Sequence, residues 1–424
     1  MEIIRLPVSG INPAPYNPRK DLKPDDSEYQ KLLRSIDEFG YIDPLVWNRR
    51  TGNLVGGHQR FKILIHKGYK EIEVSVVDLD LEKEKALNIA LNKVQGSWDN
   101  EKLAALLDEL SKMPDFDIES TGFTPVEISQ LFDRYLQVGD EDDFDTKGVA
   151  DSITEPVTQR GEIIELGPHR ILCDDCSVSA NLERLMSGKK AGLFFSDPPY
   201  NVDYVAGQRP NPDSRSQKPS QFAKIQSDNL NEKDYQDLLW KVFSNITPFM
   251  NKGAAAYLWN SHKNLGHMHT MLEELSFHIA SVIVWAKPNF AISFGDYNEQ
   301  VEFCLYCWLE NNGSHKWFGP TNESTLWEVK RDPAKQYIHP TQKPIALAQR
   351  AIINSSVKGD IVLDAFLGSG STLIAAQSMG RSCYGLEIDP RYCDAIVRRY
   401  IAYVGQDKVS TDILKRYFEG DQNE

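Results

Sequence analysis

The sequence predicts an α/β protein, in which an open and mainly parallel sheet with helices on both faces follows a smaller α+β unit. Two observations lead to this prediction. Short apolar runs at 191–195, 361–363 and 382–386 are typical of buried parallel strands, and amphipathic segments separate them. Each run ends in a polar turn, and open α/β sheets bind ligands outside the carboxyl ends of their strands. The 424 residues are enough for two or three domains.

The smaller unit is expected over residues 1–138. Its predicted elements are an extended proline-rich segment at 11–19, a helix at 25–40, strands at 45–47, 54–55 and 74–77, and helices at 58–66, 81–94, 101–110 and 126–136. Gly56 and Gly57 immediately precede the helix at 58–66, and Arg60 lies in its first turn. Free N–H groups at a helix start, together with a guanidinium, are suited to bind an anion such as a phosphate.

Charge and composition indicate a linker between the two units and limit how the protein can contact nucleic acid or a membrane. The acidic and polar stretch at 139–160 is expected to be a linker. A net charge of -14 argues against non-specific coating of nucleic acid, so DNA contacts must come from local basic patches. No apolar stretch approaches the ~20 residues of a membrane-spanning helix. The N-terminus lacks a signal-peptide pattern, and the six cysteines fit a reducing cytoplasm, which is the expected location.

The first motif with chemical meaning is the turn Ser196-Asp197-Pro198-Pro199-Tyr200. Its prolines end the preceding strand because they donate no hydrogen bond to a sheet, and they fix the Pro198 carbonyl in a rigid backbone. A rigid carboxylate and a rigid carbonyl can bind both N–H groups of an amine on a planar ring, while Tyr200 can stack on a flipped base. The alternative is a surface turn that contains these residues by chance.

The second motif is an acid, an aromatic residue and two glycines: Asp364, Phe366, Gly368 and Gly370. The glycines allow a ligand to approach the backbone closely, and Phe366 offers a flat surface for an adenine ring. Glu387 ends the next strand about 20 residues later, a spacing that places a carboxylate on ribose hydroxyls. A nicotinamide dinucleotide site is the alternative, but it would favour a third glycine at position 373, which holds leucine.

Together the two motifs resemble the S-adenosylmethionine-dependent amino-group DNA methyltransferases, in the permuted β-type order, over about 161–400. The resemblance implies a Rossmann-like methyltransferase domain over 161–424, S-adenosylmethionine as cofactor and DNA as partner, as in restriction-modification systems. It implies that Asp197, Pro198, Pro199 and Tyr200 are catalytic. The cofactor-binding residues that it implies are Asp175, Thr341, Lys343, Asp364, Phe366, Gly368, Gly370 and Glu387. For the acid that contacts the adenine of the cofactor, Asp174 remains the alternative to Asp175, because the family usually has glycine at position 174.

The sequence leaves alternatives open for the base that is methylated and for the reaction itself. Aspartate at the first catalytic position favours adenine N6, since the cytosine-N4 enzymes of this family more often have serine there. A second hypothesis is a DNA-binding regulator in which a nucleotide-gated N-terminal domain is the working part and the methyltransferase fold is vestigial. A third is methylation of RNA or of a protein glutamine. A homodimer is compatible with the sequence.

The N-terminal stretch resembles the ParB/sulfiredoxin-like domain through Asn17-Pro18-Arg19, the turn at 40–44 and the loop at 56–60. The resemblance implies that Gly56, Gly57 and Arg60 contact nucleotide phosphates. His58 stands where sulfiredoxins have a cysteine, so repair of sulfinic acids is not expected. The alternatives are a loop that only positions the domain, or one that contacts a DNA phosphate.

A long polar loop at 203–224 follows the catalytic motif. We expect it to order on DNA, with four cations on the phosphates: Arg209, Arg215, Lys218 and Lys224. Plain disorder is the alternative. A metal is not expected, because the pair Cys304 and Cys307 lies in a predicted strand and residues three apart on a strand point to opposite faces.

Overall fold

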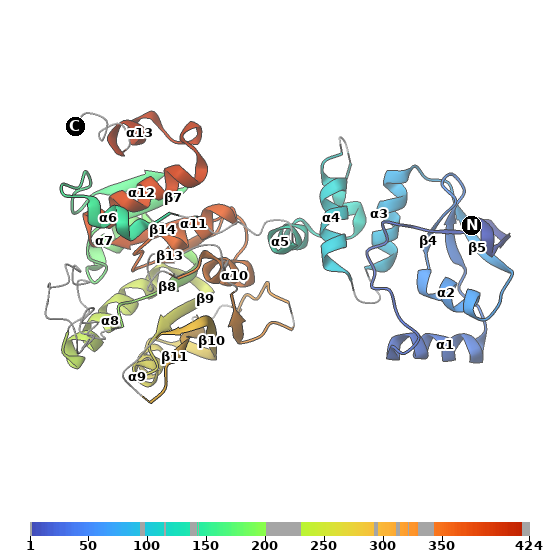
Figure 1. Cartoon of the computed structure of the whole chain (residues 1–424), viewed down its shortest axis with the longest axis horizontal. Helices are drawn as coiled ribbons and strands as arrows, with labels where there is room; N and C mark the ends of the chain where they lie inside the picture. The colour runs from blue at the N-terminus through green and yellow to red at the C-terminus, as the bar shows by residue number, and fades with distance from the viewer. Residues whose placement is uncertain are drawn as a thin grey trace, which may run out of the picture. The chain divides into compact units, whose positions relative to one another are not determined.

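The structure is a computed structural model that describes residues 2–93, 98–113, 116–135, 142, 144–200, 230–291, 296–310, 314–320, 322–329 and 343–417. Its contacts divide the chain into two compact units, Met1–Val138 and Gly139–Glu424 (Figure 1). Within the described residues, no helix is both long and apolar enough to cross a membrane.

The first unit is an α+β domain, as predicted. Its sheet has the order β1-β5-β3-β4-β2, formed by β1 (Glu2–Pro7), β2 (Asn12–Pro13), β3 (Leu45–Asn48), β4 (Asn53–Gly56) and β5 (Glu71–Val77). The helices are α1 (Ser27–Phe39), α2 (His58–His66), α3 (Leu81–Asn92), α4 (Asn100–Ser111) and α5 (Pro125–Tyr135). One apolar cluster packs α1 and α2 on the sheet, and a second joins the later helices α3, α4 and α5. Each cluster is a small core of its own.

Glu84 ties α3 to the sheet of the first unit. This fully buried carboxylate accepts hydrogen bonds from Tyr16, Asn48, Thr51 and Asn53. Burial raises the pKa of Glu84, but the four hydrogen bonds outweigh it and hold the pKa below its ordinary value. The carboxylate therefore stays charged, and its donors fix the turn between β3 and β4 against α3.

The second unit is built on a nine-stranded sheet with the order β12-β10-β11-β9-β8-β13-β14-β7-β6. The strands are β6 (Ile163–Leu166), β7 (His169–Cys173), β8 (Ala191–Ser196), β9 (Met250–Asn260), β10 (Phe277–Ala291), β11 (Glu299–Leu309), β12 (Leu326–Glu328), β13 (Ile361–Asp364) and β14 (Ser382–Glu387). The five central strands β9, β8, β13, β14 and β7 are mutually parallel. The three apolar runs of the sequence are β8, β13 and β14, which confirms them as neighbouring buried strands.

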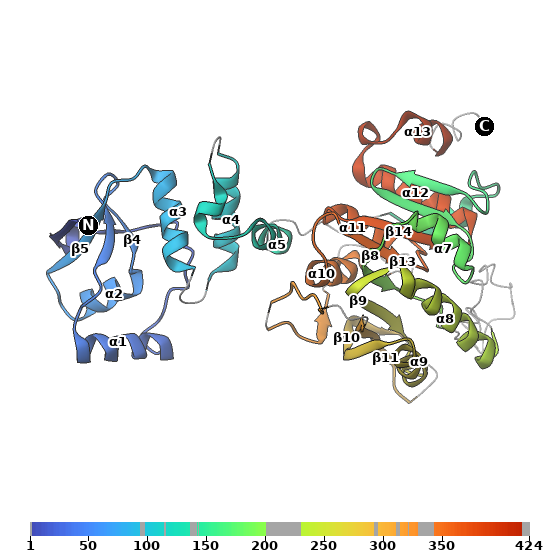
Figure 2. The ribbon, with the colours of Figure 1, turned by 180° about the vertical axis from the view of Figure 1, so that it is seen from behind.

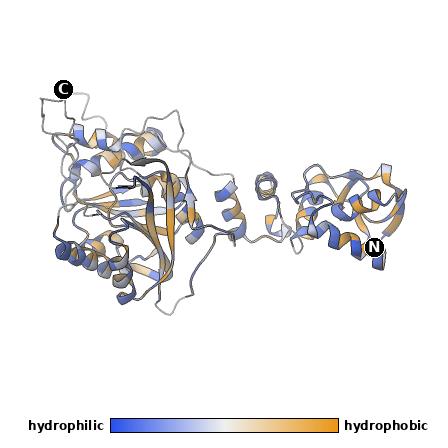
Figure 3. Cartoon of the chain, turned by 60° about the horizontal axis from the view of Figure 1, so that its bottom comes forward, coloured by the Kyte–Doolittle hydropathy of each residue, from blue (hydrophilic) through white to orange (hydrophobic). Residues whose placement is uncertain are grey.

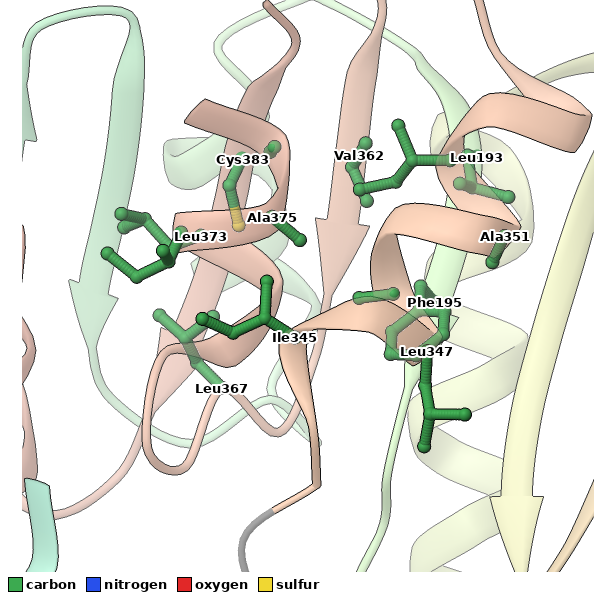
Figure 4. Packing of buried hydrophobic residues seen from close by; sticks show 14 of the residues in the cluster. Leu193, Phe195, Ile345, Leu347, Ala351, Val362, Leu367, Leu373, Ala375 and Cys383 are labelled. Carbon is green, nitrogen blue, oxygen red and sulfur yellow. The ribbon is translucent and has the colours of Figure 1, made fainter. Parts of the chain in front are cut away.

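Helices cover both faces of this sheet, which gives a three-layer α/β/α fold (Figure 1 and Figure 2). On one face lie α7 (Ser179–Met186), α8 (Glu232–Ile246) and α9 (Leu265–Glu274). On the other lie α10 (Ile345–Ser355), α11 (Ser371–Ser378), α12 (Pro390–Val404) and α13 (Thr411–Tyr417). The strands between these layers are largely apolar along their length (Figure 3). In the core, Leu193 and Phe195 of β8 lie close to Val362 of β13 and to residues of α10 (Figure 4).

Part of the stretch expected as a linker is packed on the second unit. Helix α6 (Thr146–Ser152) lies within it and contacts α12. Asp142 forms a bidentate ion pair with Arg399, whose side chain is 1% exposed. The backbone N–H groups of Val157 and Thr158 donate to Asp394. The prediction of a solvated linker over 139–160 is therefore wrong for these residues. Acidic composition alone does not show that one of the acids pairs with an arginine buried in a distant part of the chain.

Candidate active site

The carboxyl ends of four parallel strands bring the predicted acids to one edge of the sheet. Asp197 directly follows β8, Asp364 ends β13, and Glu387 ends β14. Asp175 lies two residues beyond the end of β7. Since these strands are adjacent in the order β8-β13-β14-β7, the predicted catalytic and cofactor-binding acids line one rim. This is the edge at which open α/β sheets bind their ligands.

Asp364 joins the catalytic turn to the cofactor loop. Its carboxylate accepts hydrogen bonds from the hydroxyls of Ser196 at 2.8 Å and Thr372 at 2.7 Å, and from the backbone N–H of Phe366 at 3.1 Å. Burial raises the pKa of Asp364 to about 6 in spite of these donors. Asp364 therefore links the end of β8 to the loop that follows β13 and to the start of α11. Sequence reasoning did not assign this role to Ser196 or Thr372.

The glycine loop has the backbone conformation that its sequence predicts. Gly368 and Gly370 have φ angles of 52° and 81°, in the left-handed region that favours glycine. A Cβ on Gly370 would also lie 3.0 Å from Ile396. The N–H of Gly368 donates to Glu387 at 2.8 Å, and the N–H of Asp389 donates to its other oxygen at 2.9 Å. Burial raises the pKa of Glu387 to about 7 in spite of these donors.

The structure favours Asp175 over Asp174 as the acid at the end of β7. Asp174 accepts hydrogen bonds from the Arg160 guanidinium at 3.3 Å and from the N–H of Asp175. Asp175 accepts from the N–H of Ser177 at 2.8 Å, and its described contacts include no cation. The Asp175 carboxylate therefore keeps acceptor capacity, and its role in binding the cofactor stays a prediction.

The catalytic turn is held by hydrogen bonds from Lys343 and Asn264. Lys343 Nζ donates to Asp197 Oδ2 and to the Tyr200 hydroxyl, both at 2.7 Å. Asn264 donates to the Tyr200 carbonyl at 3.0 Å. Asp197 Oδ1 is buried and has no hydrogen-bond partner among the described atoms. A buried carboxylate oxygen without a donor is costly, which marks it as the place for a ligand N–H.

Glu302 of β11 is a site residue to which sequence reasoning gave no role. Its carboxylate lies 2.9 Å from Lys343 Nζ and 2.5 Å from Lys287 Nζ, and it accepts from the Tyr200 hydroxyl at 3.3 Å. An acid near the start of an otherwise apolar strand was the signal that could have identified it. Lys343 itself was predicted to bind the cofactor carboxylate, whereas the structure places its ammonium on the catalytic turn.

Several predicted residues lie outside the described part of the chain. They are Thr341 of the cofactor set and the four cations of the polar loop, Arg209, Arg215, Lys218 and Lys224. Their roles stay predictions.

Two pairs of cysteines have a spacing of three residues, Cys173 with Cys176 and Cys304 with Cys307, and each pair is divided between the two faces of the sheet. Cys304 and Cys173 belong to the apolar cluster on one face, while Cys307 and Cys176 belong to the cluster on the other. The opposite orientation predicted for Cys304 and Cys307 is therefore confirmed.

The glycine loop of the first unit precedes α2 as predicted. Gly57 has a φ angle of 90°, and a Cβ there would overlap the Leu45 side chain. Arg60 donates to the Asp43 carbonyl at 2.6 Å and pairs with the Asp43 carboxylate. Burial lowers the pKa of His58 to about 4, so its imidazole is neutral. Within the described residues three buried polar atoms here have no hydrogen-bond partner: Asn17 Oδ1, His58 Nε2 and Gln59 Oε1.

The fold and the rim define an α/β methyltransferase domain joined to an N-terminal ParB-like domain. Residues 191–398 match the N6_N4_Mtase family model, described as DNA methylase. Residues 1–93 match the ParB N-terminal domain, and residues 101–160 match the ParB-methyltransferase HTH domain. The match over residues 191–398 confirms the predicted class for this domain, a DNA methylase of the group that includes N6 and N4 enzymes. S-adenosylmethionine, the predicted cofactor, is present in solved structures of similar fold.

Two curated relatives are type II methyltransferases. The chain is 26% identical over 223 residues to the type II methyltransferase M2.MboI of Moraxella bovis, covering 49% of this chain and 80% of that protein. It is 26% identical over 251 residues to the type II methyltransferase M.HinfI of Haemophilus influenzae, covering 54% and 67%. Among solved structures, the M1.HpyAVI complex with S-adenosylmethionine is 23% identical, with a TM-score of 0.41 and coverage of 54% of this chain and 97% of that one.

Proposed function

We propose that this protein transfers a methyl group from S-adenosylmethionine to the N6 amine of adenine in DNA. The observation that carries the proposal is the partnerless, buried Oδ1 of Asp197 at the same rim as the glycine loop. Aspartate at this position supports adenine by family resemblance, and cytosine N4 is the alternative because both amines present two N–H groups on a planar ring.

The residues at the rim fit the proposed cofactor. Glu387 ends β14 beside the Gly368 backbone, where its carboxylate would accept hydrogen bonds from ribose hydroxyls. Among the described residues, only the Phe366 carbonyl, at 3.8 Å, would meet a Cβ at Gly368, so the loop is open enough for close approach of a ligand. Phe366 and Asp175 would hold the adenine ring. When bound, the cofactor supplies an electrophilic methyl group.

The catalytic turn would activate the amine of the target base. Asp197 Oδ1 accepts one N–H and the Pro198 carbonyl accepts the other, which draws the nitrogen lone pair out of the ring. The freed pair attacks the methyl carbon in line, so that an N–C bond forms as the carbon–sulfur bond breaks. Tyr200 stacks on the flipped base. The methylated nitrogen then carries an extra proton, and the adjacent Asp197 carboxylate is placed to take it.

One experiment tests this function directly. The full chain is incubated with DNA and S-adenosylmethionine labelled in its methyl group, and the modified nucleosides are separated by chromatography. We expect label in N6-methyladenine. Label in N4-methylcytosine would select the alternative base. Absence of label in DNA, with label in RNA or protein or in no acceptor, would favour the other hypotheses, including a DNA-binding regulator with a vestigial methyltransferase fold.

For the first unit we propose that Gly56, Gly57 and Arg60 bind a nucleotide phosphate. The support is the turn at the start of α2 and the three buried, partnerless polar atoms beside it. Binding of each of the four ribonucleoside triphosphates by the full chain, measured by equilibrium dialysis, tests it. Arg60→Ala is expected to weaken binding about tenfold or more, since a charge-assisted hydrogen bond is lost. No binding of any triphosphate would reject the proposal.

A further inference from the structure

The ammonium of Lys343 is saturated by acceptors of the catalytic turn and of β11. Its Nζ lies 2.7 Å from Asp197 Oδ2, 2.7 Å from the Tyr200 hydroxyl and 2.9 Å from Glu302 Oε2. An ammonium has three N–H groups, so these three acceptors use all of them. The Lys343 side chain is only 11% exposed. In this arrangement Lys343 has no donor left for the carboxylate of the cofactor.

A second layer of contacts holds Lys343 in place. Glu302 also pairs with Lys287 of β10 at 2.5 Å, so one carboxylate joins two ammonium groups. Burial raises the pKa of Glu302, but Lys343 and Lys287 outweigh it and hold the pKa at about 2. Lys343 Nζ also lies 5.0 Å and 5.2 Å from the ring centres of Tyr200 and Trp259, within the range of cation–π attraction.

We propose that Lys343 and Glu302, with Lys287 behind them, form a lysine clamp that orients the catalytic carboxylate and stabilises its negative charge. This inference rests on the proposed methyl transfer to DNA. Lys343 occupies Asp197 Oδ2 and leaves Oδ1 for the amine of the base. Glu302 is a positioning residue, because it touches Lys343 and Tyr200 and acts on Asp197 through them.

The charges around Asp197 determine what the clamp does. Burial raises the pKa of Asp197, Lys343 lowers it, and Glu302 raises it again. Within the described residues, the other titratable groups that face this turn are Tyr200, Asp364 and Cys304. A protonated Asp197 is a poorer acceptor for the amine. When Lys343 is removed, burial and Glu302 both act to raise the pKa of Asp197 without opposition from Lys343. The methylation rate of such a variant should then reach its maximum only at a higher pH.

The first test is the pH profile of the single-turnover methylation rate of Lys343→Gln. We expect its acidic limb to move up by about one pH unit or more, so that the loss of rate is about tenfold greater at pH 6 than at pH 8.5. The double variant Lys343→Gln/Glu302→Gln should move the acidic limb back down, since a negative neighbour of Asp197 is gone. The Kd for S-adenosylmethionine, which also reports that the site is folded, should change by less than about threefold.

The second test is Glu302→Gln, with Glu302→Asp as the conservative variant. Lys343 then loses one of its two carboxylates, so its ammonium deprotonates more easily and the alkaline limb should move to lower pH. We expect a rate about 100-fold lower from misplacement of the turn, with partial recovery in Glu302→Asp. Glu299→Gln is the matched control on the same strand, because Glu299 is exposed and pairs only with His262 among the described contacts.

Three outcomes would overturn the clamp. A rate reduced by the same factor at every pH in Lys343→Gln would show a merely structural role. A Kd for the cofactor weakened more than about tenfold would place Lys343 on the methionine carboxylate instead. Both outcomes leave the proposed function intact, because the wild type still methylates DNA. An inactive wild type would reject the proposed function and the clamp together.

Discussion

At the scale of single residues, the two oxygens of Asp197 have different surroundings. Oδ2 is bound by Lys343, whereas Oδ1 is buried and without a donor in the part of the chain that the structure describes. The protein thus fixes one oxygen of this carboxylate, and in the proposed function the other oxygen accepts from the amine of the base. Prolines 198 and 199 add rigidity to the same turn, so that the position of the free oxygen is set before the base arrives.

The first prediction at this scale concerns Asp197. Asp197→Ala should lower the single-turnover methylation rate by ~10²–10⁴, because an acceptor for the reacting amine is lost. The Kd for S-adenosylmethionine should hardly change. The rate and the Kd are measured by transfer of labelled methyl groups and by calorimetry. Asp237→Ala, an exposed acid on α8, is the matched control. Near-normal turnover in Asp197→Ala would contradict the assignment.

The second prediction concerns Glu387, whose pKa burial raises to about 7. Ribose hydroxyls would donate to the ionised carboxylate, so binding of the cofactor should release a proton. Affinity for S-adenosylmethionine should therefore rise as pH increases from 6 to 8, by at most about tenfold for each unit below the pKa. Calorimetry in buffers of different ionisation enthalpy measures the released proton. Glu387→Gln should bind weakly and without this pH dependence, and an unchanged slope would contradict the role.

At the scale of elements, buried polar groups fix how helices and strands meet. Nδ1 of His169 on β7 accepts a hydrogen bond from the N–H of Cys383 on β14 at 2.9 Å. The Nε2–H of the same ring then donates to the side-chain oxygen of Gln377 on α11 at 2.7 Å. Glu84 plays a similar part in the first unit, where it joins α3 to the turn between β3 and β4. Such groups stabilise only the one arrangement in which every partner is present.

Protonation of His169 should destabilise the second unit. Burial lowers the pKa of His169 to about 4, while the unfolded chain has the ordinary value of 6.5. Because the folded state binds the proton less well, this contribution is fully present above pH 6.5 and is lost as pH falls towards 4. The expected slope is up to about 1.4 kcal/mol per pH unit. Urea unfolding between pH 4.5 and 7.5 measures it, and the slope should be shallower in His169→Gln.

Removal of the Glu84 carboxylate should destabilise the first unit. Glu84→Ala leaves four donors without an acceptor, and we expect a loss of roughly 3 kcal/mol in the free energy of unfolding. Urea unfolding of the full chain, followed by tryptophan fluorescence, measures this value. Glu82→Ala, exposed on the same helix, should change it by less than about 0.5 kcal/mol. Equal stability of the two variants would refute the role of Glu84.

At the scale of the whole molecule, the segment that follows the first unit reaches the cofactor loop. Arg399 pairs with Asp142 and donates to the Ser369 carbonyl at 2.9 Å, and the Thr146 hydroxyl donates to the same carbonyl at 3.2 Å. Ser369 lies between the two glycines of the loop. The region that leads out of the ParB-like domain therefore supports the backbone that is expected to hold the methyl donor.

Loss of this support should weaken the cofactor site. Asp142→Ala leaves the buried Arg399 without its carboxylate, which should cost the second unit about 3 kcal/mol or more. We also expect the Kd for S-adenosylmethionine to rise about tenfold, a typical effect of removing an indirect support. Thermal unfolding and calorimetry measure the two effects. Asp151→Ala, exposed on α6, is the control, and a cofactor affinity equal to that control would contradict the coupling.

Local patterns predicted the elements of the rim well. The strand before Asp197 and the strand before Asp364 were identified by apolar runs, and the prolines and glycines that follow them mark their ends. The stretch at 139–160 was misjudged, because acidic composition describes solvation and not partners. Asp142 and Arg399 are separated by more than half of the chain, so no periodicity connects them.

The sequence by itself determined where the chemistry lies, since Asp197-Pro-Pro-Tyr200 and the glycine loop depend on backbone properties of a few adjacent residues. Only the tertiary structure decided what those residues contact. The order of strands in the sheet brings Glu302 of β11 and Lys343 before α10 to the turn after β8. Which cation neutralises which acid depends on distances across the folded sheet, and a linear sequence carries no distances between segments that are remote along the chain.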